Sequence, residues 1–125
     1  MEHKFDQFHY IGWPDFGAPQ KPDSILVLAK AMRKLVAEKK KNLKVLVHCS
    51  AGVGRTGTFI SLYQFMEILD EMIPEYKRLE QSSPTNEKEL DEMTIDVFNA
   101  VFTLRKQRCE MVGVFQRIYS YLNKL

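Results

Sequence analysis

The stretch from residue 43 to residue 60 constrains this chain most, because it joins an apolar run, a glycine-rich loop and a helical pattern without a break. Residues 45–47 are apolar and favour a strand, and the loop has glycines at positions 52, 54 and 57. Glycines let successive backbone N–H groups turn towards one centre, and the start of the following helix adds partial positive charge. The sequence therefore predicts a strand, a loop that binds a phosphate-sized anion, and a helix.

Two side chains give this loop a reactive character: Cys49 begins it and Arg55 closes it. A planar guanidinium binds two oxygens of one anion, while the thiol lies beneath the same anion. Inward N–H groups can lower the pKa of a cysteine from about 8.5 to roughly 3.5–7.5, so Cys49 is expected to be a thiolate nucleophile. A nucleotide-binding loop is excluded, because Cys49 replaces its first glycine and Arg55 replaces its lysine.

A second loop, residues 13–19, contains two prolines, a glycine and one carboxylate, Asp15, beside large aromatic residues. An aryl phosphate leaves faster when its bridging oxygen is protonated, and a positioned general acid contributes about 10²–10⁴-fold. Such a segment on its own is usually an ordinary turn. Combined with the cysteine loop further along the chain, it makes Asp15 the candidate general acid.

Residues 48–57 resemble the signature loop of the protein tyrosine phosphatases, and residues 13–17 resemble the acid loop of that family. The resemblance implies hydrolysis of phosphotyrosine in proteins through a cysteinyl phosphate, with no cofactor or metal ion. Cys49 would attack phosphorus, Arg55 would bind the phosphoryl group, and Asp15 would act as acid and then as base. The implied phosphate-binding set is Ser50, Ala51, Gly52, Val53, Gly54 and Arg55. The implied supporting set is His48, Thr56, Trp13 and Gln116.

The predicted fold class is α/β: a partial fold of the tyrosine phosphatase type, with parallel strands, flanking helices and the phosphate loop between strand and helix. Residues 5–11 are expected to form a strand, and a helix from about 23 to 39 then leads to the strand at 45–47, which makes a right-handed crossover. The helix after the loop is expected to end at residues 73–74, and residues 74–92 to form an exposed connection or a partly disordered insertion. Helical spacing returns near residues 95–104 and 115–122. Residues 104–112 also resemble the family segment that packs behind the phosphate loop.

Composition places the chain among single-domain soluble proteins. It has 125 residues, of which 45% are hydrophobic and 27% charged, and a net charge of +2, which is too small to argue for nucleic acid. No apolar run approaches the roughly 18 residues of a membrane helix, so no membrane partner and a cytoplasmic location are predicted. The two cysteines, Cys49 and Cys109, lack metal-site spacing and suit a reducing compartment.

The resemblance covers the carboxyl-terminal half of the family's catalytic domain, and this leads to three further expectations. Residues 1–125 are expected to form one truncated catalytic domain that self-associates, or pairs with a missing amino-terminal half, through apolar helix faces that include Phe59, Phe65 and Phe98. Gly113 stands where the family has a glutamine that handles water. The alternative function is therefore a weak or inert phosphotyrosine-binding or regulatory module. Dual specificity is the alternative for the substrate class.

Overall fold

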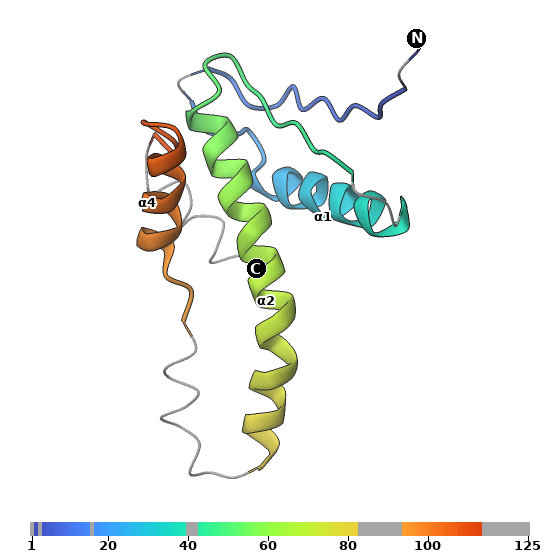
Figure 1. Ribbon diagram of the computed structural model, residues 1–125, viewed down its shortest axis with the longest axis vertical. Coiled ribbons are helices and arrows are strands. Elements are labelled where there is room, and N and C mark those ends of the chain that lie inside the picture. Colours follow the sequence, from blue (N-terminus) through green and yellow to red (C-terminus); the bar gives the residue numbers. More distant parts are fainter. Residues whose placement is uncertain (1, 3, 16, 40–42, 83–93, 114–125) are drawn as a thin grey trace.

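The computed structural model describes residues 2, 4–15, 17–39, 43–82 and 94–113 (Figure 1). These residues form three helices, α1 (Pro22–Lys39), α2 (Gly54–Ser82) and α4 (Val97–Gln107). None of the residues in these ranges belongs to a strand, so the parallel sheet expected from residues 5–11 and 45–47 is not confirmed. A strand needs a neighbouring strand to bind its backbone groups. The two segments run without such a ladder, and Phe5, Ile11 and Leu46 are 83%, 85% and 87% exposed.

Helix α1 confirms the helix expected over residues 23–39. Proline is favoured at the first position of a helix, and the chain has Pro22 there. Asp23 in the first turn and Lys39 in the last turn both complement the helix dipole. The buried face of α1 carries Ile25, Leu26 and Ala29.

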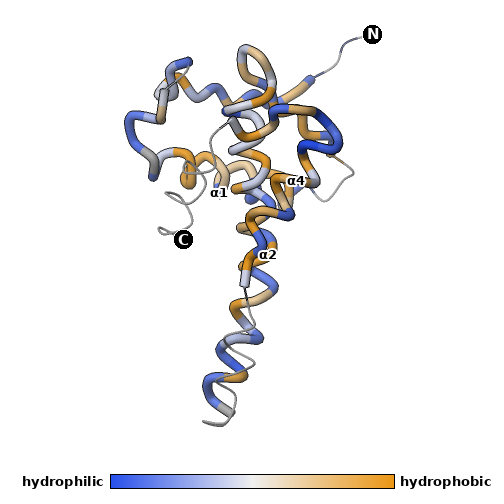
Figure 2. Tube along the Cα trace, turned by 90° about the vertical axis from the view of Figure 1, so that its left-hand side faces the viewer, coloured by the Kyte–Doolittle hydropathy of each residue, from blue (hydrophilic) through white to orange (hydrophobic). Residues whose placement is uncertain are grey.

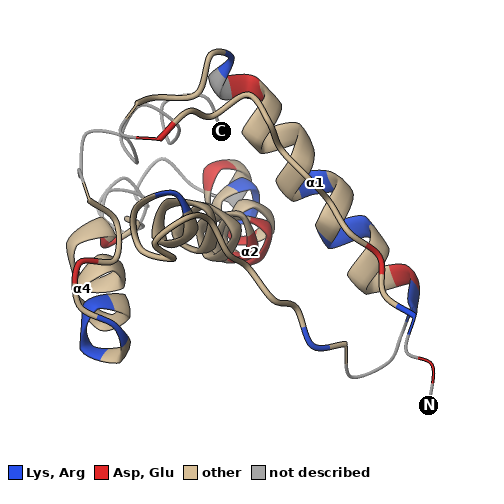
Figure 3. Ribbon diagram, turned by 90° about the horizontal axis from the view of Figure 1, so that it is seen from above, with Lys and Arg blue, Asp and Glu red and all other residues tan. Residues whose placement is uncertain are grey.

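Helix α2 lies between the other two helices when the molecule is viewed from above (Figure 3). On one side, the first core cluster joins residues of the acid loop, α1 and α2: Trp13, Ile25, Leu26, Ala29, Phe59, Leu62 and Met66. On the other side, the second core cluster joins α2 to α4 and the segment after it: Phe65, Val97, Val101, Leu104, Met111 and Val112. The described elements therefore bury both sides of the first half of α2.

This arrangement corrects the expected exposure of the phenylalanines. Phe59 and Phe65 are 9% and 0% exposed, because α1 and α4 cover the two sides of α2 that carry them. Phe98, which lies on the outer face of α4, is 68% exposed as expected. Of the three phenylalanines expected to be exposed, only Phe98 on α4 is therefore exposed.

Helix α2 also continues beyond residues 73–74, where the sequence predicted its end, and it projects away from the other elements (Figure 2). Pro74 lies inside it, although an interior proline costs about 3 kcal/mol through a lost N–H and a clash. Two features offset this cost: the exposed surroundings let water reach the freed carbonyl, and good helix formers follow. Glu75 and Arg78 form an ion pair one turn apart. Residues 74–82 thus belong to a helix and not to the expected connection, although residues 74–78, 80 and 81 are exposed as expected, and residues 83–92 lie outside the described residues.

Helix α4 confirms the helix expected near residues 95–104. Asp96 caps it by accepting a hydrogen bond from the Asn99 N–H at 2.8 Å. The helix expected over residues 115–122, which includes Gln116, lies outside the described residues. In the part of the chain that the structure describes, no helix is both long and apolar enough to cross a membrane.

Candidate active site

The predicted phosphate loop, residues 49–55, leads from the extended segment 43–48 into the first turn of α2. Gly52 has a φ of 69°, a left-handed conformation that favours glycine. A Cβ atom at Gly57 would lie 2.5 Å from the backbone N of Val112, so only glycine allows this close approach. The Gly57 and Val112 N–H groups both donate to the Val53 carbonyl, at 2.8 and 3.3 Å. The segment after α4 therefore packs directly behind the loop, as the resemblance implied.

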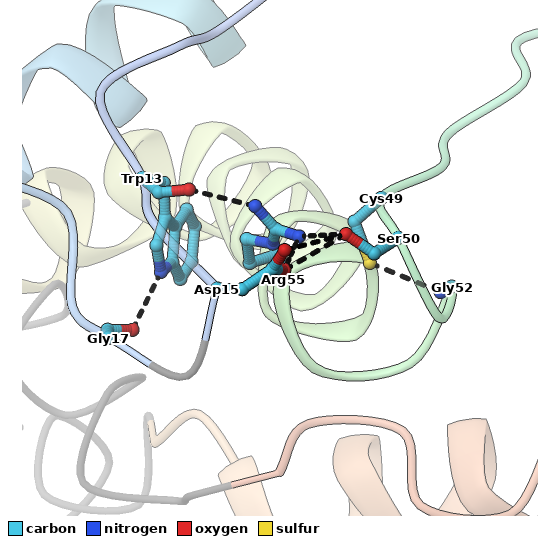
Figure 4. A network of polar contacts seen from close by, with 7 residues as sticks. All are labelled: Trp13, Asp15, Gly17, Cys49, Ser50, Gly52 and Arg55. Carbon is cyan, nitrogen blue, oxygen red and sulfur yellow. Dashed lines mark hydrogen bonds and ion pairs between the residues drawn. The ribbon is translucent and has the colours of Figure 1, made fainter.

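The Cys49 thiol is partly buried at the opening of this loop, and the Gly52 N–H donates to its sulfur at 3.2 Å (Figure 4). Burial by itself raises the pKa of the Cys49 thiol. The dipoles of the Thr56 hydroxyl and of the N–H groups of Thr56, Gly52 and Val53 together outweigh burial and lower this pKa to about 7. About half of the thiol is therefore ionised at neutral pH.

Thr56 is the supporting residue whose side chain bears most directly on the sulfur. Its hydroxyl is buried and has no hydrogen bond of standard geometry, so its interaction with Cys49 is looser than that of the Gly52 N–H. A hydroxyl dipole close to sulfur still favours the thiolate over the thiol. His48, the other supporting residue in this loop, is exposed.

The Arg55 guanidinium joins the phosphate loop to the acid loop (Figure 4). Its Nη1 donates to the Trp13 carbonyl at 2.8 Å, and its Nη2 donates to the Ser50 hydroxyl at 2.6 Å. Nη2 also forms an ion pair with the Asp15 carboxylate. The expected phosphate clamp thus holds the expected general acid.

Asp15 lies against the phosphate loop, although 55% of its side chain is exposed. The Ser50 hydroxyl is 2.9 and 3.0 Å from the two carboxylate oxygens of Asp15 and is oriented to donate to them. Trp13 anchors the acid loop, because the residue is 5% exposed in the first core cluster and its Nε1 donates to the Gly17 carbonyl at 3.0 Å. The buried Trp13 therefore holds a solvent-accessible carboxylate against Ser50 and Arg55 of the loop.

The turn after α4 is held in an unusual conformation behind the phosphate loop. Val112 has a φ of 60°, which costs a β-branched residue of the order of 1–3 kcal/mol. Arg105 stabilises this turn by donating to the Met111 and Val112 carbonyls at 2.9 and 3.0 Å. Val112 is also fully buried in the second core cluster. Packing and hydrogen bonds together fix the segment that leads to Gly113.

Sequence reasoning brought together Cys49, Arg55 and Asp15, but it missed two contacts of the loop. It did not pair Ser50 with Asp15, and it did not single out Arg108, whose Nη2 donates to the Ala51 carbonyl at 2.9 Å. The one available signal was the likeness of residues 104–112 to a segment that packs behind the loop. Gln116, expected to handle water, lies outside the described residues.

Comparison with known proteins agrees with this arrangement. Residues 1–124 match the family model described as protein-tyrosine phosphatase. The human receptor-type tyrosine-protein phosphatase eta is 34% identical over 122 residues, which are 98% of this chain and 8% of that protein. The mouse receptor-type tyrosine-protein phosphatase alpha is 33% identical over 116 residues, 92% of this chain and 11% of that protein. The chain thus spans a small part of the length of these relatives. A cysteine loop, a clamping arginine and an acid loop in one site, together with a family match over nearly the whole sequence, identify the chain as a member of the protein-tyrosine phosphatase family.

Proposed function

We propose that this chain hydrolyses phosphotyrosine in proteins through a cysteinyl phosphate on Cys49. The observation that carries the proposal is the convergence of three groups: a thiol with a pKa of about 7, the Arg55 guanidinium, and the Asp15 carboxylate. A nucleophile, an oxyanion clamp and a proton donor are the groups that this two-step reaction requires.

In the first step, the Cys49 thiolate attacks phosphorus, and a sulfur–phosphorus bond forms as the bond from phosphorus to the tyrosine oxygen breaks. The leaving oxygen takes a proton from Asp15. The loop N–H groups and Arg55 stabilise the charge on the three remaining phosphoryl oxygens. His48 acts by orienting the loop.

Substrate binding requires an exchange of partners at Arg55. The guanidinium forms an ion pair with Asp15, and a phosphoryl group would offer the guanidinium two oxygens in place of that carboxylate. Release from Arg55 leaves Asp15 available to carry the proton that the leaving oxygen needs. The ion pair therefore keeps Asp15 beside Arg55, where the phosphoryl group would bind.

In the second step, Asp15 accepts a proton from water as that water attacks phosphorus, and the sulfur–phosphorus bond breaks. The Thr56 hydroxyl stabilises the thiolate that departs. The chain has Gly113 where the family places a glutamine that handles water, so this step lacks one positioning group. If the activation barrier of this step were about 1.4 kcal/mol higher because the water is less well positioned, the step would be about tenfold slower.

Replacing Gly113 by glutamine should therefore raise the steady rate and shrink the initial burst of product. Among the residues that the structure describes, no heavy atom lies within 4 Å of a Cβ atom built at Gly113, so these residues leave room for the substitution. Rapid mixing with a chromogenic aryl phosphate measures both quantities, and the wild-type burst should approach one equivalent of enzyme. Gly113→Ala is the matched control, since it adds a Cβ without an amide. The absence of a burst in the wild-type chain, with no gain from glutamine, would contradict this account of the second step.

The substrate class is tested by comparing phosphotyrosine and phosphothreonine peptides of otherwise identical sequence. We expect phosphate release from the phosphotyrosine peptide only, and vanadate should inhibit it by occupying the loop. Equal rates on the two peptides would favour dual specificity instead.

A phosphotyrosine-binding or regulatory module is the second candidate function, and the Gly113 position favours it. A module would bind vanadate or a phosphotyrosine peptide without releasing phosphate, which the same assay detects. Self-association, or pairing with a missing amino-terminal half, stays a prediction, although Phe59 and Phe65 are buried and only Phe98 of the three named phenylalanines is exposed. The cytoplasmic location stays a prediction as well, because the relatives are named receptor-type.

A further inference from the structure

Arg108 connects the end of α4 to the middle of the phosphate loop. It is the carboxyl-terminal cap of α4, and its backbone N–H donates to the Leu104 carbonyl at 3.0 Å. Its side chain crosses to the loop, where Nη2 donates to the Ala51 carbonyl at 2.9 Å. A Cβ atom built at Gly52 would lie 3.6 Å from Nη2 and 3.7 Å from Cζ of Arg108. The guanidinium therefore lies over the peptide unit that joins Ala51 to Gly52.

That peptide unit is bound on both of its edges. In a trans peptide the C=O and the N–H point in opposite directions, and none of the described peptides is cis. The Ala51 carbonyl points to Arg108, so the Gly52 N–H points the other way, where it donates to the Cys49 sulfur at 3.2 Å. Rotation of this peptide would break both hydrogen bonds together.

We propose that Arg108 is a positioning residue for Cys49, which acts by holding the Ala51–Gly52 peptide so that its N–H faces the sulfur. Arg108 acts through one peptide plane and makes no described contact with Cys49. The proposal rests on the proposed function only in taking Cys49 as the nucleophile. The left-handed φ of Gly52 is the backbone conformation that this peptide orientation adopts.

The positive charge of Arg108 is a competing explanation for any effect on the thiol. An exposed charge acts through solvent, and salt screens it, with a Debye length of about 10 Å at 0.1 M and about 3 Å at 1 M. A peptide held by a hydrogen bond keeps its orientation at either salt concentration. Salt dependence therefore separates orientation from charge.

The test is the pH dependence of Cys49 alkylation by iodoacetamide, a neutral reagent, in chains that carry Cys109→Ser. The wild-type midpoint should lie near the Cys49 pKa of about 7. Arg108→Met should raise the midpoint by about one unit, the size of one lost hydrogen bond to a charged group, at low and at high salt. At pH 7 the alkylation rate should then fall about fivefold. Arg108→Lys, which keeps one donor and the charge, should shift the midpoint by less.

Lys106→Met is the matched control, because it removes a charge from the same helix end, where Lys106 lies 4.7 Å from the centre of the Phe102 ring. Its midpoint should stay at the wild-type value. An unchanged midpoint in Arg108→Met with an intact circular dichroism spectrum would overturn the proposal, and so would a shift that 1 M salt abolishes. If Arg108→Met does not fold, the midpoint of Arg108→Lys decides: a wild-type value at both salt concentrations would overturn it. Alkylation needs no turnover, so a chain that alkylates as predicted but releases no phosphate contradicts only the proposed function.

Discussion

Replacing Cys49 by serine is expected to lower the turnover of an aryl phosphate by roughly 10⁴–10⁶-fold, as for other lost nucleophiles. The loop N–H groups and Thr56 bring the pKa of the Cys49 thiol to about 7. An alcohol is a far weaker acid than a thiol, so the same hydrogen bonds leave a serine hydroxyl protonated and unreactive. In the wild-type chain kcat/KM should rise with pH around 7 as the Cys49 thiol ionises. The serine variant should show no such rise.

Cys109→Ser is the matched control for this substitution. Cys109 is exposed in the turn after α4, so its replacement by serine should leave turnover unchanged. Vanadate binding by Cys49→Ser, followed by calorimetry, reports whether the loop itself remains intact. Full activity of Cys49→Ser at equal enzyme concentration would refute a cysteinyl phosphate.

Replacing Asp15 by asparagine should reduce the first step by about 10²–10⁴-fold, the usual contribution of a general acid. An amide cannot donate the proton that the departing oxygen needs, so the loss should be largest for phenols that are poor leaving groups. For phenols that leave readily as anions, the loss should be small. Burst rates across a series of aryl phosphates measure this dependence.

The same substitution should have an opposite effect on binding. A phosphoryl group must compete with Asp15 for Arg55, and exposed ion pairs of this kind contribute up to about 1 kcal/mol. Asp15→Asn should therefore tighten vanadate binding by up to about fivefold. Asp70→Asn is the matched control, because Asp70 pairs with Arg33 at 2.6 Å rather than with the loop. A loss of rate that is equal for all leaving groups would show that Asp15 is not the acid.

Features that depend on neighbouring residues could be read from the sequence. The glycine at 52, the cysteine loop and the start of α1 follow from backbone conformations and spacings within a few residues. The helix start at Pro22 and the cap at Asp96 are local for the same reason. Local interactions of this kind depend little on how the rest of the chain folds. The expectations for α1, α4 and a lowered Cys49 pKa accordingly agree with the structure.

Only the tertiary structure decided the features that depend on distant residues. The ion pair between Arg55 and Asp15 and the hydrogen bond from Arg108 to the Ala51 carbonyl join positions 40 and 57 residues apart. The continuation of α2 through Pro74 depends on exposed surroundings that no local pattern reveals. The two expected strands failed to form a ladder among the described residues, since a strand is stabilised by its neighbour rather than by its own residues. The sequence alone therefore determined which chemical groups the site contains. Long-range packing determined which of these groups form hydrogen bonds and ion pairs with one another.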